Sequence, residues 1–144
     1  MISAEDECIG EVIHKGQERK QSPTRILIVD DDSSVRELLE FFLSREAEIT
    51  LAGNGRAALE KMEDQNFDLI ISDVDMPITN GIDFFLRLHA EDENVNRKFL
   101  FCTGYINDEL REVCDRYQVR FCLKPIDVLS VQEIVRQMVE LTFV

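Results

Sequence analysis

The sequence predicts an α/β fold in which one doubly wound, five-stranded parallel sheet lies between two layers that together hold five helices. Two observations support this prediction. From residue 25 onward, short apolar runs alternate five times with longer segments that carry apolar residues at helical spacing. The apolar runs are nearly continuous, which is typical of parallel strands that helices cover on both faces.

The first three strand–helix units are marked as follows. RILIVD at 25–30 is the first strand, and Ser34 with Glu37 has the spacing of a capping box at the start of the first helix. EITLAG at 48–53 is the second strand, and GRAALEKME at 55–63 is the second helix. FDLIISD at 67–73 is the third strand. Pro77 and Gly81 mark the turn behind it, and the third helix has an apolar face at Ile82, Phe85, Leu86 and His89.

The last two units repeat the pattern. KFLFCT at 98–103 and VRFCLK at 119–124 are the fourth and fifth strands. The fourth helix has apolar positions at 110, 113, 114 and 117, and the fifth at 131, 134, 135, 138 and 141. We therefore assign residues 25–144 to one domain. Residues 1–24 are mixed and polar and end in a Ser-Pro turn, so we expect a flexible N-terminal tail, although Ile9, Val12 and Ile13 have the spacing of a short docking helix.

The composition excludes several classes of protein. A net charge of −13 argues against a surface that binds nucleic acid or anionic membranes, because such surfaces need clustered Lys and Arg. The sequence has neither an apolar run of about 20 residues nor the features of a signal peptide, so we expect a cytoplasmic protein.

The four cysteines do not suggest a metal site. None forms a CxxC pair and only two histidines are present, which argues against a zinc site. Cys102 and Cys122 lie in apolar strand-like runs, and we expect buried thiols there rather than a disulfide.

Polar residues gather where the predicted strands end. The first strand runs into Asp30, Asp31 and Asp32, and the third ends at Asp73, with Asp75 two residues later. The fourth strand ends at Thr103, and the fifth ends at Lys124, which Pro125 follows. Ligands of open α/β sheets bind at the carboxyl ends of the strands, so these side chains are expected at one site.

The residue types at this edge indicate a particular chemistry. Several carboxylates without His or Cys suit a hard cation, Mg²⁺ best and Mn²⁺ as a substitute, and the cation relieves the repulsion among the acids. Lys124 adds a second positive charge and Thr103 a hydroxyl donor. A carboxylate nucleophile, a divalent metal, a lysine and a hydroxyl are the parts of phosphoryl transfer onto an aspartate.

The motifs IVDDD, ISDVDMPITNG, FCTG and CLKPI stand at the four strand ends in this order. Through them, about residues 25–143 of the chain resemble a response-regulator receiver domain of two-component signalling. Each motif alone is weak, but four of them at the correct strand ends are specific. The resemblance implies a flavodoxin-like sheet of strand order 2-1-3-4-5. Because no output domain follows the fifth helix, we expect the stand-alone, chemotaxis-type form.

The resemblance also implies roles at the acidic end of the site. Asp73 matches the phospho-accepting aspartate. Asp30 and Asp31 match the pair that holds Mg²⁺, with Asp31 the direct ligand and Asp30 acting partly through water. Asp75 stands where the family uses a backbone carbonyl as a metal ligand. Asp32 is expected to be a solvated residue at the start of the helix.

Further roles fall on the last two strands. Thr103 matches the switch hydroxyl, Lys124 matches the family lysine that precedes a cis proline, and Phe121 lies at the aromatic switch position. The side chains of Asp75 and Tyr105 either tune dephosphorylation or simply face water. Gly104 either leaves access for the phosphoryl group or is a plain turn glycine.

The implied function is Mg²⁺-dependent acceptance of a phosphoryl group from a histidine kinase or a histidine phosphotransfer protein. A downstream protein would then read the face built from the fourth helix, fifth strand and fifth helix. Leu110, Tyr117 and Leu129 are candidates for that face, although packing in the core explains Leu110 and Tyr117 equally well. We expect a monomer or a phosphorylation-linked homodimer, and no enzyme activity beyond self-catalysed phosphoryl transfer and slow autodephosphorylation.

Three other functions share some features with this sequence. A receiver-like interaction module that works without phosphorylation would be expected to lack some of the acids, the threonine or the lysine, and all are present. DVDMP resembles the DxD motif of haloacid-dehalogenase-type phosphatases, but there the motif ends the first strand, whereas here it ends the third. A dinucleotide-binding domain would need a GxGxxG sequence after the first strand.

Overall fold

The computed structural model describes residues 23–142. The strands are β1 (Thr24–Val29), β2 (Ala47–Ala52), β3 (Leu69–Asp73), β4 (Phe99–Thr103) and β5 (Arg120–Leu123). The helices are α2 (Ser33–Leu43), α3 (Gly55–Asp64), α4 (Gly81–Glu91), α5 (Asp108–Tyr117) and α6 (Val128–Thr142), with a short 3-10 helix η2 (Val95–Lys98) before β4. Residues 1–22 of the predicted tail lie outside the described residues, and Thr24 already belongs to β1.

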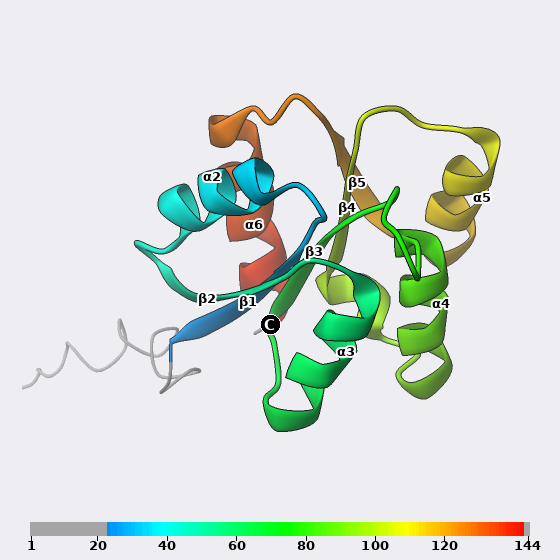
Figure 1. Cartoon of the computed structure of the whole chain (residues 1–144), viewed down its shortest axis with the longest axis horizontal. Coiled ribbons are helices and arrows are strands. Elements are labelled where there is room, and N and C mark those ends of the chain that lie inside the picture. The colour runs from blue at the N-terminus through cyan, green and yellow to red at the C-terminus, as the bar shows by residue number, and fades with distance from the viewer. Residues whose placement is uncertain (1–22, 143–144) are drawn as a thin grey trace, which may run out of the picture.

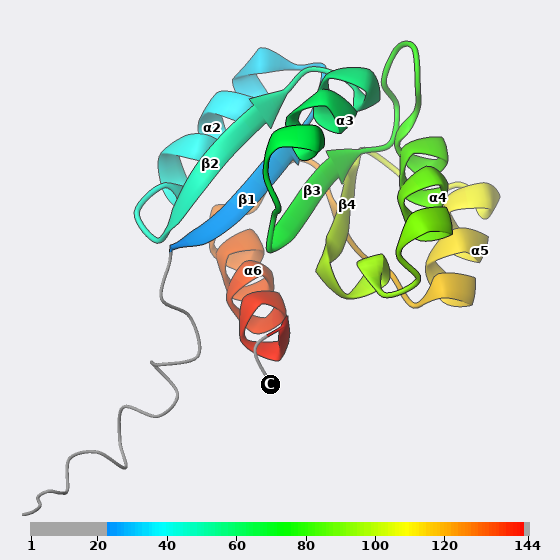
Figure 2. The same ribbon diagram turned by 90° about the horizontal axis from the view of Figure 1, so that it is seen from below.

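The five strands form one parallel sheet, as the sequence predicts, and their order β2-β1-β3-β4-β5 is the one that the resemblance implies. Helices α2 and α6 cover one face of the sheet, and α3, α4 and α5 cover the other (Figure 1). Figure 2 shows the neighbouring strands β2, β1 and β3 pointing the same way. Their carboxyl ends therefore meet at one edge.

Each face of the sheet has its own core. The core under α3, α4 and α5 is rich in aromatic side chains, including the fully buried Phe84, Phe85, Phe99 and Phe101. The core under α2 and α6 is mainly aliphatic and also contains Cys102. Buried aromatic and aliphatic side chains of this size supply the main favourable free energy of folding.

The burial of three residues resolves an alternative that the sequence left open. Leu110 is buried and Tyr117 is half-buried, and both pack in the core under α3, α4 and α5. Leu129 of α6 is 76% exposed. Of the three residues considered for an interaction face, Leu129 is therefore the one that is open to a partner.

The start of α2 differs from the prediction. The expected capping box of Ser34 and Glu37 is wrong, because the N-cap is Asp32, whose side chain accepts a hydrogen bond from the Ser34 N–H. A carboxylate at this position both satisfies a free N–H group and lies at the positive end of the helix. The expectation that Asp32 starts the helix is confirmed.

The inner face of α4 is shifted from the predicted one. Phe84 and Leu88 are buried together with Ile82 and Phe85, whereas Leu86 and His89 are half-buried. The predicted set of positions belongs to the same broad apolar stripe but is centred too far round the helix. Tertiary packing against β4 and α5 selects which part of the stripe faces inward.

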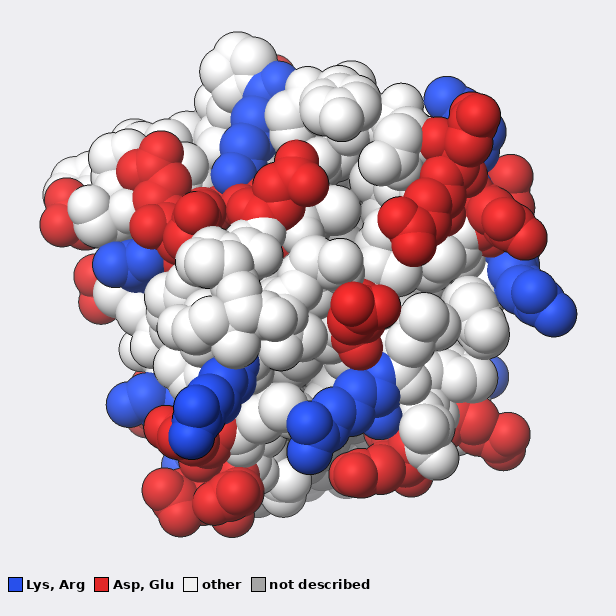
Figure 3. All heavy atoms as spheres, turned by 45° about the vertical axis from the view of Figure 1, so that its right-hand side comes forward, with Lys and Arg blue, Asp and Glu red and all other residues white. Residues whose placement is uncertain are grey.

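The described helices and the charged side chains bear on possible contacts with membranes and nucleic acids. Within residues 23–142, no helix combines the length and apolar character that a membrane span needs. On the face in Figure 3, basic side chains are scattered among acidic ones rather than gathered in one patch.

Candidate functional site

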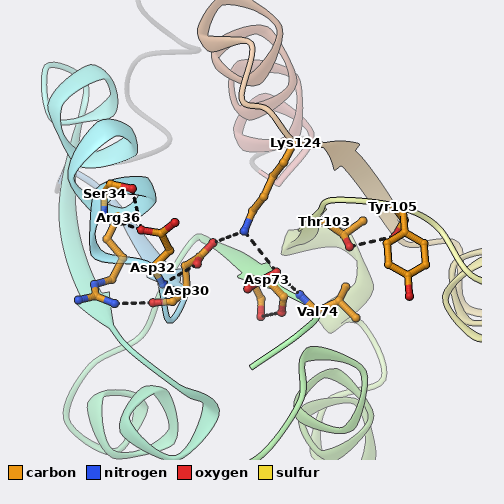
Figure 4. Close-up of polar contacts among 10 residues, drawn as sticks. Asp30, Asp32, Ser34, Arg36, Asp73, Val74, Thr103, Tyr105 and Lys124 are labelled. Atoms are coloured by element: carbon orange, nitrogen blue, oxygen red, sulfur yellow. Dashed lines mark hydrogen bonds and ion pairs between the residues drawn. The ribbon is translucent and has the colours of Figure 1, made fainter. Parts of the chain in front are cut away.

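The predicted polar residues do meet at the carboxyl edge of the sheet. Asp30 follows β1, Asp73 ends β3, Thr103 ends β4 and Lys124 follows β5. The parallel register sets Asp73 beside Cys102 and Thr103 beside Leu123, so the strand ends lie level. Figure 4 shows Lys124 reaching from the β5 end toward the two aspartates.

Lys124 bridges the two buried carboxylates. Its Nζ lies 2.8 Å from Oδ2 of Asp30 and 3.4 Å from Oδ1 of Asp73. The Asp30 side chain is 3% exposed and that of Lys124 is 21% exposed. The ammonium group is thus shared between two negative charges in a partly dehydrated place, where charge interactions are stronger than in water.

Asp30 is also positioned by hydrogen bonds from Asp32 and Arg36. Its Oδ1 accepts a hydrogen bond of 2.9 Å from the N–H of Asp32, and its carbonyl oxygen accepts one of 2.5 Å from the guanidinium of Arg36. Arg36 lies in α2, six residues further along the chain. Sequence reasoning missed this residue, because no local pattern links an arginine on a helix to the carbonyl group at the preceding strand end.

Asp73 is positioned through its backbone and its side chain. Its Oδ1 accepts a 2.8 Å hydrogen bond from the N–H of Val74, and its carbonyl oxygen accepts one of 2.9 Å from the hydroxyl of Ser72. A Cβ atom on Gly81 would lie 2.1 Å from that carbonyl oxygen. Gly81 therefore does more than make a turn, because it lets the start of α4 pack directly against the end of β3.

The charges of the site shift the pKa values of Asp73 and Lys124. Burial, and next the negative charge of Asp30, raise the pKa of Asp73 to about 6, while Lys124 acts in the opposite direction. Burial opposes the charged form of Lys124, but the hydrogen bond to Asp30 and the charges of Asp30 and Asp73 outweigh it and raise the pKa of Lys124. Lys124 therefore stays an ammonium, whereas burial and the charge of Asp30 disfavour the ionised form of Asp73.

Three carboxylates could hold a cation. One oxygen each from Asp30, Asp31 and Asp73 lies within 4.8 Å of the other two, with Asp31 exposed and the other two buried. An all-oxygen donor set that is open to water on one side fits Mg²⁺ or Mn²⁺, which keep several water ligands. The side chain of Asp75 is exposed and lies outside this cluster.

The residues expected to tune or switch the site lie beside it. The hydroxyl of Thr103 donates to the carbonyl oxygen of Tyr105 at 3.0 Å, and the backbone N–H of Lys124 donates to the carbonyl oxygen of Thr103 at 2.7 Å. Tyr105 is 65% exposed, and a Cβ atom on Gly104 would meet no atom within 4 Å. Phe121 is half-buried against the aromatic core.

The peptide bond between Lys124 and Pro125 is cis, as the resemblance implies. The roles assigned to the site residues stay predictions, because their positions do not test them. This holds for Asp30, Asp31, Asp73 and Lys124 as well as for Asp75, Thr103, Tyr105, Gly104 and Phe121.

The chain matches one family over most of its length. The model of the response regulator receiver domain family matches residues 26–136. An uncharacterized 14.6 kDa protein of Leptolyngbya boryana is 33% identical over 114 residues, which is 78% of this chain and 87% of that protein. The transcriptional regulatory protein ResD of Bacillus subtilis is 46% identical over 86 residues, 51% of this chain and 36% of ResD. The chain thus spans about a third of ResD.

The fold is also similar to that of a solved structure. The chemotaxis protein CheY4 of Vibrio cholerae has 25% sequence identity and a TM-score of 0.73, and the superposition covers 81% of this chain and 99% of that chain.

Proposed function

This chain belongs to the response regulator receiver domain family of two-component signalling, and on that premise we propose that Asp73 accepts a phosphoryl group in a reaction that depends on Mg²⁺. The observation that carries the proposal is the Lys124 ammonium group between Asp30 and Asp73, next to an all-oxygen cluster of three carboxylates. Receiver domains act as signalling modules, so we propose no turnover beyond this transfer and the slow hydrolysis of the phosphoaspartate to aspartate and inorganic phosphate.

The donor is a phosphohistidine on a histidine kinase or a histidine phosphotransfer protein. A carboxylate oxygen of Asp73 attacks phosphorus, the bond between phosphorus and the histidine nitrogen breaks, and the imidazole keeps the electron pair. Asp73 must be ionised to attack, and a pKa of about 6 leaves it mostly ionised at pH 7.

Charge control falls to the residues around Asp73. Lys124, 3.4 Å from Oδ1 of Asp73, is placed to bind an oxygen of the incoming phosphoryl group. Asp30, Asp31 and Asp73 would hold the cation, together with the backbone carbonyl of Asp75. When bound, the cation supplies positive charge that offsets the carboxylates and the phosphoryl oxygens.

The output follows from a change of partner at Thr103. Its hydroxyl leaves the carbonyl of Tyr105 and donates to the phosphoryl group instead. Phe121, now half-buried, moves into the space that Thr103 vacates, and the face of α5, β5 and α6 changes shape. Leu123 and Leu129 are 51% and 76% exposed there, and they offer apolar contacts to a downstream protein or a second copy of the chain.

The rate of phosphate loss is the last part of the proposal. The side chains of Asp75 and Tyr105 are exposed, and a Cβ atom on Gly104 would meet no atom within 4 Å. We assign these residues to the control of water access. We also place the protein in the cytoplasm, where the family's kinases present their phosphohistidines.

The test is labelling by a small phosphoryl donor such as acetyl phosphate, followed by intact mass. We expect one phosphoryl group per wild-type chain with Mg²⁺ and none with a chelator, and none on Asp73→Asn in either case. Asp64→Asn, the same change at an exposed carboxylate at the end of α3, is the matched control and should label like wild type. Labelling of Asp73→Asn at the wild-type rate would overturn the proposal.

A second experiment addresses the output. Beryllofluoride imitates the phosphoryl group on an aspartate, and binding partners captured by treated and untreated protein can be compared. A partner that depends on the treatment should be lost when Leu129 is changed to Ser.

A further inference from the structure

Two cysteine thiols lie side by side on the neighbouring strands β4 and β5, next in sequence to Thr103 and Phe121. Cys102 of β4 and Cys122 of β5 are register partners in adjacent parallel strands, so their side chains project from the same face of the sheet. Both contact the core under α2 and α6, and both are free thiols. Adjacent strands are about 4.8 Å apart, which falls within the roughly 4.4–6.8 Å between the Cα atoms of disulfide partners.

We propose that Cys102 and Cys122 are an oxidative modification site, at which a peroxide forms a disulfide that slows phosphoryl uptake by Asp73. The second half of this inference rests on the proposed function, whereas the first half depends only on the placement of the two thiols.

The pair has one accessible and one protected member. Strand β5 is an edge of the sheet and Cys122 is half-buried, whereas Cys102 is 2% exposed. The hydrogen bond with the Cys102 thiol, and then the charge of Lys124, lower the pKa of Cys122, although burial opposes them. Because the thiolate is the reactive form, Cys122 is the first to react and Cys102 is the resolving thiol.

The chemistry balances with peroxide as the oxidant. The Cys122 thiolate attacks one peroxide oxygen, the O–O bond breaks, and the departing oxygen leaves as water after taking up a proton. The sulfur of Cys102 then attacks the sulfenic sulfur of Cys122. The hydroxyl group of the sulfenic acid leaves with the proton of the Cys102 thiol as a second water molecule. In total, two thiols lose two electrons and two protons, and one peroxide becomes two waters. A small dithiol reverses the reaction by exchange.

The cross-link would act on the site through the ends of β4 and β5. Thr103 directly follows Cys102, and Lys124 lies two residues after Cys122. The 2.7 Å hydrogen bond from the Lys124 N–H to the Thr103 carbonyl already joins these two ends. A disulfide draws the two Cβ atoms to about 3.8 Å and turns them about the new bond, which shifts the strand ends.

That shift moves the ammonium group on which the transfer depends. Lys124 is held at 2.8 Å from Asp30 and 3.4 Å from Asp73. A displacement on the order of 1 Å in a reacting group can slow a reaction by about 100-fold, so a few tenths of an ångström should slow labelling roughly tenfold.

The test uses a full-length reference protein whose other two cysteines are removed, Cys8→Ser with Cys114→Ser. Hydrogen peroxide should lower the intact mass of this protein by two hydrogens. A thiol-blocking reagent added afterwards should not increase the mass, because no free thiol is left. The oxidised protein should take up phosphoryl from acetyl phosphate roughly tenfold more slowly, and dithiothreitol should restore both mass and rate. Adding Cys122→Ser, or Cys122→Ala if serine disturbs folding, should remove both responses.

The outcomes separate the two proposals. If peroxide leaves the reference protein without a disulfide, the modification site is refuted, whatever the labelling shows. If the disulfide forms but oxidised and reduced proteins label at equal rates, its effect on Asp73 is refuted. If the reduced reference protein never labels, the proposed function fails, and the effect on Asp73 fails with it, while the mass measurement still decides whether the thiols pair.

Discussion

Asp73→Asn should make the metal-free protein more stable near neutral pH, although the same change should abolish phosphoryl uptake. The wild-type carboxylate is buried beside Asp30, and this raises its pKa from 3.8 to about 6. An asparagine has the same shape, and its amide oxygen can still accept the hydrogen bond from Val74. It removes the charge that burial and Asp30 disfavour, and Lys124 keeps its 2.8 Å contact with Asp30.

The size and the pH dependence of this effect follow from the raised pKa. The difference between 3.8 and about 6 corresponds to about 3 kcal/mol of lost stability when Asp73 is fully ionised. Because the folded state holds the proton more tightly than the unfolded state, stability falls as the pH rises from about 4 to about 6 and then levels off. Asp73→Asn should therefore gain about 1–3 kcal/mol at pH 8 and almost nothing at about pH 4.

Urea unfolding with a chelator, over this pH range, measures the effect. The control is Asp75→Asn, the same change at an exposed carboxylate, which should stay within about 0.5 kcal/mol of wild type at every pH. Mg²⁺ should narrow the gap between wild type and Asp73→Asn, because a cation that binds the folded carboxylates stabilises wild type by mass action. A gain for Asp73→Asn that is independent of pH, or absent at pH 8, would refute the view that Asp73 is electrostatically strained.

Three further substitutions test the supports of the site. Lys124→Gln should raise the pKa of Asp73 further above about 6, because Lys124 lowers that pKa. An NMR titration of the Asp73 carboxyl group that shows an unchanged pKa would contradict this prediction. Gly81→Ala should lower the unfolding free energy by about 3 kcal/mol, since its Cβ would meet the Asp73 carbonyl oxygen at 2.1 Å; Gly104→Ala, whose Cβ meets nothing, is the matched control in urea unfolding. Ile78→Gly should raise stability by about 0.5–1 kcal/mol, because Ile78 has a φ of 74°, and a thermal melt no higher than that of Ile78→Val would contradict this.

The parts of the fold that the sequence predicts are those written in local patterns. Continuous apolar runs identify buried parallel strands, and the polar residues that follow them, such as Asp73 and Lys124, mark the edge where ligands bind. Spacing alone cannot show how closely two elements approach. The need for glycine at position 81 appears only when α4 is packed on the end of β3, and the bond from Arg36 to Asp30 only when α2 lies over β1.

The same limit applies to competing local signals. Ser34 and Asp32 both have side chains that can cap the start of a helix. Asp32 is the N-cap, because only three residues separate the end of β1 from the start of α2. The adjacency of Cys102 and Cys122 is likewise invisible in the sequence, since it depends on the register between β4 and β5. Residues far apart in the chain thus gain a joint role only through strand order.

The balance of charge explains why the site would respond to a phosphoryl group at all. Three carboxylates and one ammonium leave two negative charges when every acid is ionised, and one divalent cation would balance them. A phosphoryl group on Asp73 then brings new negative oxygens into a place that has no spare positive charge. A further hydrogen-bond donor would help to balance them. Thr103 ends the adjacent strand β4, and its hydroxyl donates to the carbonyl of Tyr105. The movement of Thr103 is in this view a consequence of charge, and Thr103→Ala should retain labelling of Asp73 while losing the partner that depends on beryllofluoride.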